Sequence, residues 1–300
     1  MTWFLARPPG SSFTLRVILH PSSFILVVAS AILLALPPNT ASAQEFDHSH
    51  GVWTALLRKH VVLVDGGKGS QVRYAGFRQD RAALKAYLEA LSKVTREEFD
   101  GWSKARQMAF LINAYNAHTV EKILMRYPDI RSIWDFGKVI GNPFKDRFFT
   151  LLGGVSSLDQ VEHEILRKPG AYDEPRVHFA VNCASVGCPM LREEAYTGAR
   201  LAAQLEEQTR RFLSDRSRNR YDPGANRLEV SRIFDWYKVD WTSGYRGVDG
   251  GSPPLASREQ FFAHYADLLA DSPEGRKAIS ERKAEIRILE YDWALNDAKK

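Results

Sequence analysis

The sequence predicts an α+β fold, a mainly helical single domain around a small antiparallel sheet. Apolar residues recur with helical spacing over several long segments, whereas the alternating, β-branched segments are short and scattered. No repeat, low-complexity segment or interdomain linker interrupts the chain after residue 43. We therefore expect residues 53–300 to form one domain.

The first 43 residues are typical of a secretory signal peptide. Arg7 and Arg16 precede an apolar run over residues 24–36, and Ala41-Ser42-Ala43 then offers small residues for a signal peptidase. The run is shorter than the about 20 residues that span a bilayer as a helix. We expect cleavage after Ala43, an extracytoplasmic location (periplasmic or secreted) and no stable membrane span afterwards. An uncleaved anchor is the alternative.

The composition points to no nucleic-acid partner. The chain has a formal net charge of +5, and its basic residues are mixed with acidic ones along most of its length. The one basic cluster, residues 210–220, is typical of a solvated helix end and loop. Residues 44–52 are polar and predict a flexible lead-in.

The first half of the domain shows clear local patterns. Two strands, 60–65 and 71–75, are predicted to form a hairpin through the glycine-rich turn 66–69. Helical stripes predict helices over 53–59, 80–92 and 103–127, the last ended by Pro128.

The second half of the domain has fewer such patterns, mainly predicted helix N-caps and short strands. Ser157 and Gln160 have the spacing of a capping box at the start of a helix, and Ser257 and Ser272 are further predicted N-caps. We also expect a helix over 198–214 and strands over 228–230 and 285–291.

The longest predicted helix carries two carboxamides on an inward face. Asn113 and Asn116 share that face with apolar residues, and an unpaired buried amide costs about 1–3 kcal/mol. These side chains must therefore be hydrogen-bonded, either to neighbouring loops or to a substrate.

The segment 176–189 is where chemistry is expected. Alternation over 177–181 predicts a strand that places His178 and Asn182 on the face opposite its apolar residues. Cys183 follows at the strand end, where a turn begins. Cys183 and Cys188 are the only two cysteines, and in an exported protein they are a disulfide candidate.

Several motifs resemble those of the domain-of-unknown-function family 547, DUF547. The similarity covers about residues 53–296, and its motifs are Ala109-Phe-Leu-Ile-Asn-Ala-Tyr-Asn-Ala117, Val177-His-Phe-Ala-Val-Asn-Cys183 with Gly187-Cys-Pro189, Leu228-Glu-Val-Ser-Arg-Ile-Phe-Asp-Trp-Tyr237 and Tyr291-Asp-Trp-Ala-Leu-Asn296. The family pattern has glycine after its first cysteine, where this chain has Ala184. The resemblance implies the fold and the marked residues, but no reaction.

The sharpest hypothesis is a thiol enzyme with papain-like or transglutaminase-like chemistry. Cys183 would be the nucleophile and His178 the base, with Asn182 and Asn113 as orienting or oxyanion groups. An intact strand would separate Cys183 from His178 by about 16 Å, so the chain must fold back between them. Further candidates for binding or orientation are Asn116, Glu162, Asp235 and Tyr237.

Two alternatives stay open. The first is a non-catalytic extracytoplasmic binding module, stabilised by a Cys183–Cys188 disulfide, for a small molecule, a peptide or a glycan. The second is a redox or zinc site, but the Cys-x4-Cys spacing is not the thioredoxin-like Cys-x-x-Cys, and zinc would need two further ligands such as His178 or His163. We predict no metal and no cofactor.

Overall fold

The structure is a computed structural model, and it describes residues 45–137, 141–242 and 255–298. Residues 45–300 cluster into one unit. The predicted signal peptide, residues 1–43, lies outside the described residues.

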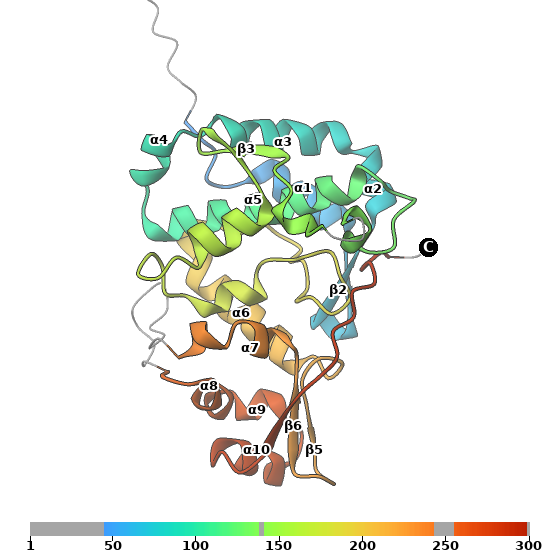
Figure 1. The fold of residues 1–300 in the computed structure, drawn as a ribbon, viewed down its shortest axis with the longest axis vertical. Coiled ribbons are helices and arrows are strands. Elements are labelled where there is room, and N and C mark those ends of the chain that lie inside the picture. The colour runs from blue at the N-terminus through green and yellow to red at the C-terminus, as the bar shows by residue number, and fades with distance from the viewer. Residues whose placement is uncertain (1–44, 138–140, 243–254, 299–300) are drawn as a thin grey trace, which may run out of the picture. The chain divides into compact units, whose positions relative to one another are not determined.

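Helix α5 (Lys104–Leu124) is the centre of the first half of this unit (Figure 1). It begins where the Arg106 N–H donates to the Ser103 hydroxyl, and every residue from Gln107 to Leu124 is buried. A helix buried on all sides is held by packing rather than by its own propensity. The elements around it are α1 (Gly51–His60), α2 (Tyr74–Gln79), α3 (Arg81–Lys93), α4 (Arg96–Asp100), β3 (Phe149–Leu151) and β4 (Gly154–Ser156).

The predicted glycine hairpin is confirmed. Strand β1 (Val61–Val64) pairs antiparallel with β2 (Gly69–Val72). Gly66 and Gly67 in the turn have φ values of 62° and 87°, a backbone conformation that glycine adopts without steric cost.

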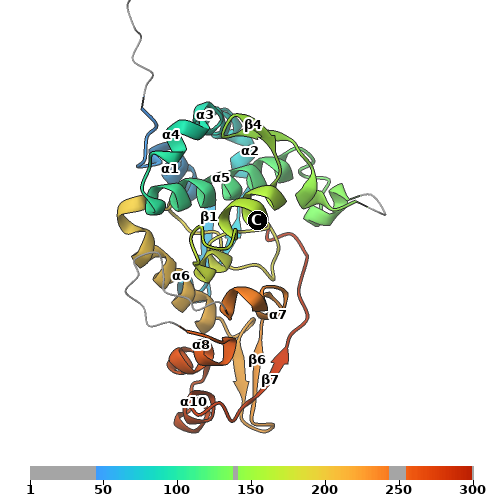
Figure 2. The same cartoon turned by 60° about the vertical axis from the view of Figure 1, so that its left-hand side comes forward.

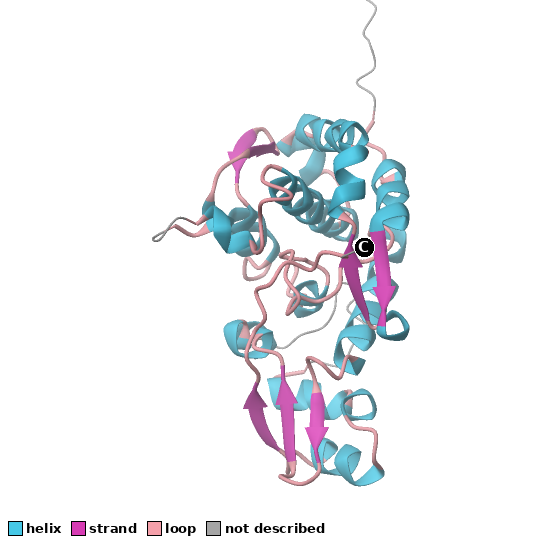
Figure 3. Cartoon of the chain, turned by 90° about the vertical axis from the view of Figure 1, so that its right-hand side faces the viewer, coloured by secondary structure: helices cyan, strands magenta, loops and turns pink. Residues whose placement is uncertain are grey.

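The other half of the unit has a second hydrophobic core, and its strands and helices lie together at the lower end of Figure 2. Its strands β5 (Arg220–Asp222), β6 (Arg227–Val230) and β7 (Glu285–Ile288) form a sheet, which Figure 3 shows beside the last helices. Strand β7 pairs parallel with β6, so this sheet is mixed rather than purely antiparallel. The helices of this half are α6 (Leu201–Ser214), α7 (Ile233–Trp236), α8 (Arg258–His264), α9 (Ala266–Leu269) and α10 (Pro273–Ser280).

The described chain is mainly helical, and its strands form three small sheets. This confirms the predicted α+β class. The difference from the prediction is that the strands are distributed over separate sheets instead of one.

The strand predicted over 177–181 is wrong. Residues Pro175–Phe179 form a short 3-10 helix, η5, because proline fixes the first helical position and the Glu174 carboxylate accepts from the Arg176 N–H. The segment is buried on all sides. His178 therefore does not lie on a solvent-facing sheet surface.

The predicted capping box is only half formed. The Gln160 N–H donates to the Ser157 hydroxyl at 3.1 Å. The Gln160 side chain contacts Ser156 instead of returning to the Ser157 backbone, and the following segment, η4 (Gln160–Leu166), is a π-helix.

The lead-in that we expected to be flexible is packed against the domain. Phe46 stacks on Trp102 with ring centroids 5.7 Å apart, and His50 Nδ1 lies 2.7 Å from the Tyr87 hydroxyl. Helix α1 begins at Gly51. The apolar partners of Phe46 come from distant segments, so the local polarity of this stretch did not indicate them.

The parts of the chain that the structure describes contain no helix long and apolar enough to cross a membrane.

Buried histidines should make the domain acid-labile. Burial lowers the pKa of His50 to about 4 and that of His118 to about 3, whereas an unfolded histidine has a pKa of about 6.5. Between those values the unfolded chain binds more protons, so stability is lost as the pH falls. The expected slope is about 1.4 kcal/mol per pH unit for each histidine.

Urea unfolding at a series of pH values between about 7 and 4 measures this slope. His118 stacks on Phe149 at 3.8 Å, and His118→Phe should reduce the slope by about one proton. His264 is exposed, and His264→Phe is the control that should keep the wild-type slope. Identical slopes for wild type and His118→Phe would contradict the prediction.

Candidate functional site

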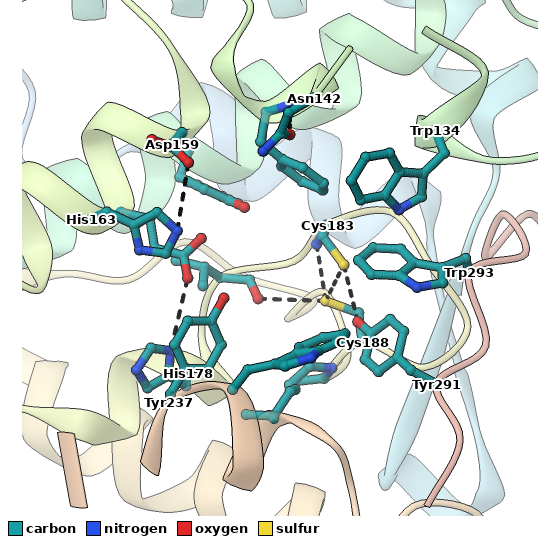
Figure 4. A pocket seen from close by; sticks show the side chains of 17 residues that line it. Trp134, Asn142, Asp159, His163, His178, Cys183, Cys188, Tyr237, Tyr291 and Trp293 are labelled. Atoms are coloured by element: carbon teal, nitrogen blue, oxygen red, sulfur yellow. Dashed lines mark hydrogen bonds and ion pairs between the residues drawn. The ribbon is translucent and has the colours of Figure 1, made fainter. Parts of the chain in front are cut away.

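An aromatic-lined pocket of about 290 Å³ brings together residues from distant parts of the chain (Figure 4). Its titratable lining groups are Asp159, Glu162, His163, His178, Cys183 and Cys188. Its aromatic lining residues are Tyr115, Trp134, Phe144, Trp236, Tyr237, Tyr291 and Trp293.

The two cysteines belong to a loop, residues 180–189, that is held by buried amide groups. Asn116 on α5 donates to the Ala180 carbonyl at 2.9 Å and accepts from the Asn182 N–H at 2.8 Å. Asn182 in turn donates to the Pro189 carbonyl at 2.7 Å and accepts from the Ala184 N–H at 2.9 Å. These bonds close the loop on itself and fix it to the central helix.

The C-terminal segment holds the same loop from the other side. The N–H groups of Val186 and Gly187 donate to the carbonyls of Ala294 and Asp292, each at 2.8 Å. Figure 1 shows this segment running from β7 back to the level of β2. It therefore carries Tyr291 and Trp293 into the pocket.

The backbone conformation of Ala184 accounts for the glycine that the DUF547 pattern has at this position. Its φ is 64°, in the left-handed region where an L-residue costs about 1–2 kcal/mol relative to the right-handed one. Glycine adopts this conformation freely. The glycine of the family pattern thus suits a turn that this chain makes with alanine.

The Cys183 sulfur is surrounded by hydrogen-bonding groups. Cys183 Sγ lies 3.0 Å from Ser185 Oγ, 3.2 Å from the Tyr291 hydroxyl and 3.0 Å from Cys188 Sγ. Cys183 is partly exposed, whereas Cys188 is buried. Hydroxyl groups that donate to a sulfur favour its thiolate form.

The two thiols have opposite pKa shifts. Burial raises the pKa of Cys183, but its hydrogen bonds with Cys188, Ser185 and Tyr291 outweigh burial, so the pKa is lowered overall. Burial and the bond to Cys183 raise the pKa of Cys188 well above its usual value. Cys183 is therefore the thiol that ionises first.

The predicted disulfide is not formed, because both cysteines are free. Their sulfur atoms are 3.0 Å apart, compared with about 2.05 Å in a disulfide bond.

His178 is bonded to an acid that the sequence did not indicate. His178 Nε2 lies 2.7 Å from Asp240 Oδ2, and Arg167 pairs with the same carboxylate at 2.6 and 3.0 Å. The imidazole also stacks on Tyr237, with centroids 3.8 Å apart. Asp240 lies 62 residues further along the chain, and no spacing connects it to His178.

The protonation of His178 follows from these contacts. Burial lowers its pKa even though Asp240 and Glu162 oppose the shift, so the neutral ring is favoured near pH 7. A carboxylate only accepts, so Nε2 carries the proton. Nδ1 is buried and, among the described residues, has no hydrogen-bond partner; Glu162 Oε1 lies 3.9 Å away.

The predicted Cys183–His178 pair is not in direct contact. Both residues line the pocket, but the described partners of the Cys183 sulfur are Ser185, Cys188 and Tyr291. Figure 4 shows Cys183, Cys188 and Tyr291 grouped together, with His178 and Tyr237 in a separate group. The chain folds back after Asn182, as we expected, and Cys183 and His178 therefore line one pocket without touching.

Two predicted orienting groups, Asn113 and Asn182, hydrogen-bond to the backbone of the protein. Asn113 is fully buried outside the pocket; it donates to the Tyr196 carbonyl at 2.8 Å and accepts from the Tyr196 N–H at 3.0 Å. Asn182 uses its amide within the cysteine loop. In this structure both amides hydrogen-bond to backbone groups.

The remaining candidates divide in the same way. Glu162 and Tyr237 line the pocket, Asn116 holds the loop, and Asp235 is exposed away from the lining. The sequence did not point to Ser185 and Tyr291 as neighbours of Cys183. Tyr291 lay in a recognised motif, so the resemblance was a signal for it.

The aromatic residues form a continuous wall. Trp293 packs against Tyr291 at 4.6 Å, Trp134 at 5.3 Å and Trp236 at 5.7 Å between ring centroids. Trp134 and Trp236 remain 37% and 42% exposed, so the wall reaches solvent. Such a surface stacks on flat or apolar ligand groups.

No cluster of three or more His, Cys, Asp and Glu side chains able to hold a metal ion is found within residues 45–137, 141–242 and 255–298.

Fold and site together define a mainly helical α+β domain with a cysteine-containing, aromatic-lined pocket. Residues 99–213 match the family described as "Protein of unknown function, DUF547", so the chain is a DUF547 domain-containing protein. The match includes His178, Cys183 and Cys188 but not Asp240 or Tyr291. Neither the comparison with curated proteins nor that with solved structures gave a match.

A structural role for Asn113 predicts a stability effect without a chemical one. Asn113→Ala leaves the N–H and the carbonyl of Tyr196 without partners, so the free energy of unfolding should fall by about 2–4 kcal/mol. The reactivity of the Cys183 thiol should be unchanged in the folded variant. Urea unfolding and thiol alkylation measure the two effects.

Asn142 provides the matched control, because it is exposed at the pocket and, among the described residues, its side chain accepts from the Phe144 N–H. Asn142→Ala should lose no more than about 1 kcal/mol. A fully stable Asn113→Ala with altered thiol reactivity would restore the catalytic assignment.

Proposed function

We propose that the pocket is the active site of a cysteine-dependent hydrolase or acyl transferase in which Cys183 is the nucleophile. The observation that carries this proposal is the set of three hydrogen-bonding groups at 3.0–3.2 Å from Cys183 Sγ. A thiolate, not a thiol, attacks carbonyl carbon, and such groups lower the cost of forming it.

The reaction has two halves. In the first, the Cys183 sulfur bonds to the substrate's carbonyl carbon, the bond to the leaving oxygen or nitrogen breaks, and the leaving group takes up a proton. In the second, water or another acceptor adds to the thioester, gives up a proton, and the carbon–sulfur bond breaks to restore the thiolate.

Glu162 and His178 are the proposed proton acceptors of the second half. Glu162 lies at the pocket, 3.9 Å from the unprotonated Nδ1 of His178. Asp240, which pairs with Arg167, accepts from His178 Nε2, so the imidazole can take a proton at Nδ1 while its ring stays oriented. Both halves of the reaction occur at the acyl carbon bound to Cys183, so in the second half the attacking water would lie between that carbon and the imidazole.

The lining indicates the kind of substrate. The described lining contains no Lys or Arg but does contain Asp159 and Glu162, which disfavours anionic ligands. The aromatic wall would bind an apolar or ring-shaped part of the substrate. A small molecule, a peptide or a glycan with an acyl group fits this description, whereas a nucleic acid does not.

We also propose that the domain acts outside the cytoplasm. The support is the signal-peptide pattern of residues 1–43.

A non-catalytic binding module is the second candidate. The exposed aromatic wall favours it, because such a surface binds ligands without any reaction. In that case a Cys183–Cys188 disulfide would stabilise the loop. The isolated, exported protein would then show no free thiol and no acylation.

The nucleophile hypothesis predicts an acid-shifted pH profile. The rate of alkylation of Cys183 by iodoacetamide should have its midpoint below the value of about 8.5 for an ordinary thiol, because the hydrogen bonds lower the pKa of Cys183. Tyr291→Phe should move the midpoint upward, and Cys183→Ala should abolish labelling. Cys188→Ala is the control that should retain labelling at Cys183; a midpoint at or above about 8.5 in the wild type would contradict the hypothesis.

The assignment of Glu162 and His178 to the second half of the reaction predicts that variants of these residues release a burst of product but turn over slowly afterwards. With an activated aryl ester, wild type should release a rapid burst of the phenol and then turn over steadily. His178→Gln and Glu162→Gln should keep the burst but lose about 10²–10⁴-fold in the steady rate. His264→Gln changes an exposed histidine that does not line the pocket, so both phases should persist. Loss of the burst in His178→Gln would place His178 in the first half of the reaction.

A further inference from the structure

We propose that Cys183 and Cys188 form a reversible redox pair, in which a small hydroperoxide oxidises Cys183 and Cys188 then closes an intramolecular disulfide. The oxidation itself requires only the two thiols. Its consequence, that the disulfide switches off the nucleophile, rests on the proposed function.

The sulfur atoms are already within reach of each other. They are 3.0 Å apart, and the Cys183 N–H also points to Cys188 Sγ at 3.0 Å. The Cys188 N–H donates to the Ser185 carbonyl, so a tight turn holds both side chains on the same side of the loop. Closing the bond requires a movement of about 1 Å, since a disulfide measures about 2.05 Å.

The two thiols are suited to different roles. Cys183 is partly exposed at the pocket, where a small oxidant can reach it, whereas Cys188 is only 4% exposed. The lowered pKa of Cys183 and the raised pKa of Cys188 agree with this division. A thiolate reacts first with peroxides, and a protected neighbouring thiol resolves the product.

The pocket admits a small, neutral oxidant. The cavity has a volume of about 290 Å³ and is lined by the aromatic wall and by acidic side chains. Hydrogen peroxide or a small organic hydroperoxide is neutral and enters such a space without a cationic binding group.

The chemistry balances in two steps. The Cys183 thiolate attacks one peroxide oxygen; an S–O bond forms, the O–O bond breaks, and the leaving oxygen takes a proton as water or an alcohol. Cys183 is thereby oxidised by two electrons to a sulfenic acid, and the peroxide is reduced. The Cys188 sulfur then attacks Cys183 Sγ; the S–S bond forms, the S–O bond breaks, and the oxygen leaves as water with the Cys188 proton. A dithiol reductant reverses the reaction and is itself converted to a disulfide.

The chain offers an unambiguous assay. It contains only these two cysteines, so every intramolecular disulfide is the proposed one. Free thiols are counted after unfolding, and intact mass separates a disulfide from oxygen adducts. Dimedone traps any sulfenic acid.

The experiment treats the reduced full chain with hydrogen peroxide. Wild type should go from two free thiols to none, gain no oxygen, form no dimers, and recover both thiols with a dithiol reductant. Cys188→Ser should instead accumulate a dimedone-reactive Cys183. Cys183→Ser should react more than about tenfold more slowly, because the thiol with the lowered pKa is gone.

Three outcomes would overturn the inference. One is wild type with a sulfenic or sulfinic Cys183 beside a free Cys188. Another is a disulfide only between chains. The third is protein isolated without free thiols whose melting temperature falls sharply on reduction, which would indicate a structural disulfide. Melting curves of both variants, with Cys188→Ala as a second form of the Cys188 test, separate misfolding from lost chemistry.

The ester assay on the same samples separates this inference from the proposed function. Disulfide closure without any ester turnover, even when reduced, would leave the redox pair standing and remove the acyl-transfer proposal. Ester turnover that peroxide does not reversibly inhibit, with no disulfide formed, would do the opposite.

Discussion

The site depends on amide groups buried on the central helix. Asn116 binds the backbone of the cysteine loop at Ala180 and Asn182, and Asn113 binds both backbone groups of Tyr196. Loop backbone that enters a core must have its polar groups satisfied. A carboxamide on a fully buried helix meets that need with one donor and one acceptor. This is why a non-regular segment can lie at the centre of the domain and carry reactive side chains.

The same constraint explains why the pocket draws on distant segments. A loop fixed to α5 on one side leaves its other side to be covered, and the C-terminal segment does so through Ala294 and Asp292. That segment brings Tyr291 to the Cys183 sulfur. The second core contributes Tyr237 beside His178. Packing of the two halves thus assembles the thiol group and the imidazole group around one cavity.

Local patterns allowed much of the fold to be predicted but not the site's partners. The hairpin and the buried helix α5 follow from glycine spacing and an apolar sequence, and both are confirmed. Alternation at 177–181 misled because every residue there is buried, so no face distinction existed for the pattern to report. Asp240 could not be inferred, because its bond to His178 joins segments that meet only in the packed structure.

The position of Cys183 also limits which chemistries are compatible with it. A sulfur that has hydroxyl neighbours but no imidazole contact is ionised by hydrogen bonds rather than by a base. These neighbours lower the pKa of the Cys183 thiol, so an electrophile that enters the pocket meets a sulfur that ionises more readily than an ordinary thiol. The Cys188 thiol, 3.0 Å away, can convert an oxidised Cys183 to a reversible disulfide before it reaches an irreversible sulfinic or sulfonic acid. A thiol with a lowered pKa and a neighbouring thiol that can resolve its oxidised form are therefore complementary features of one loop.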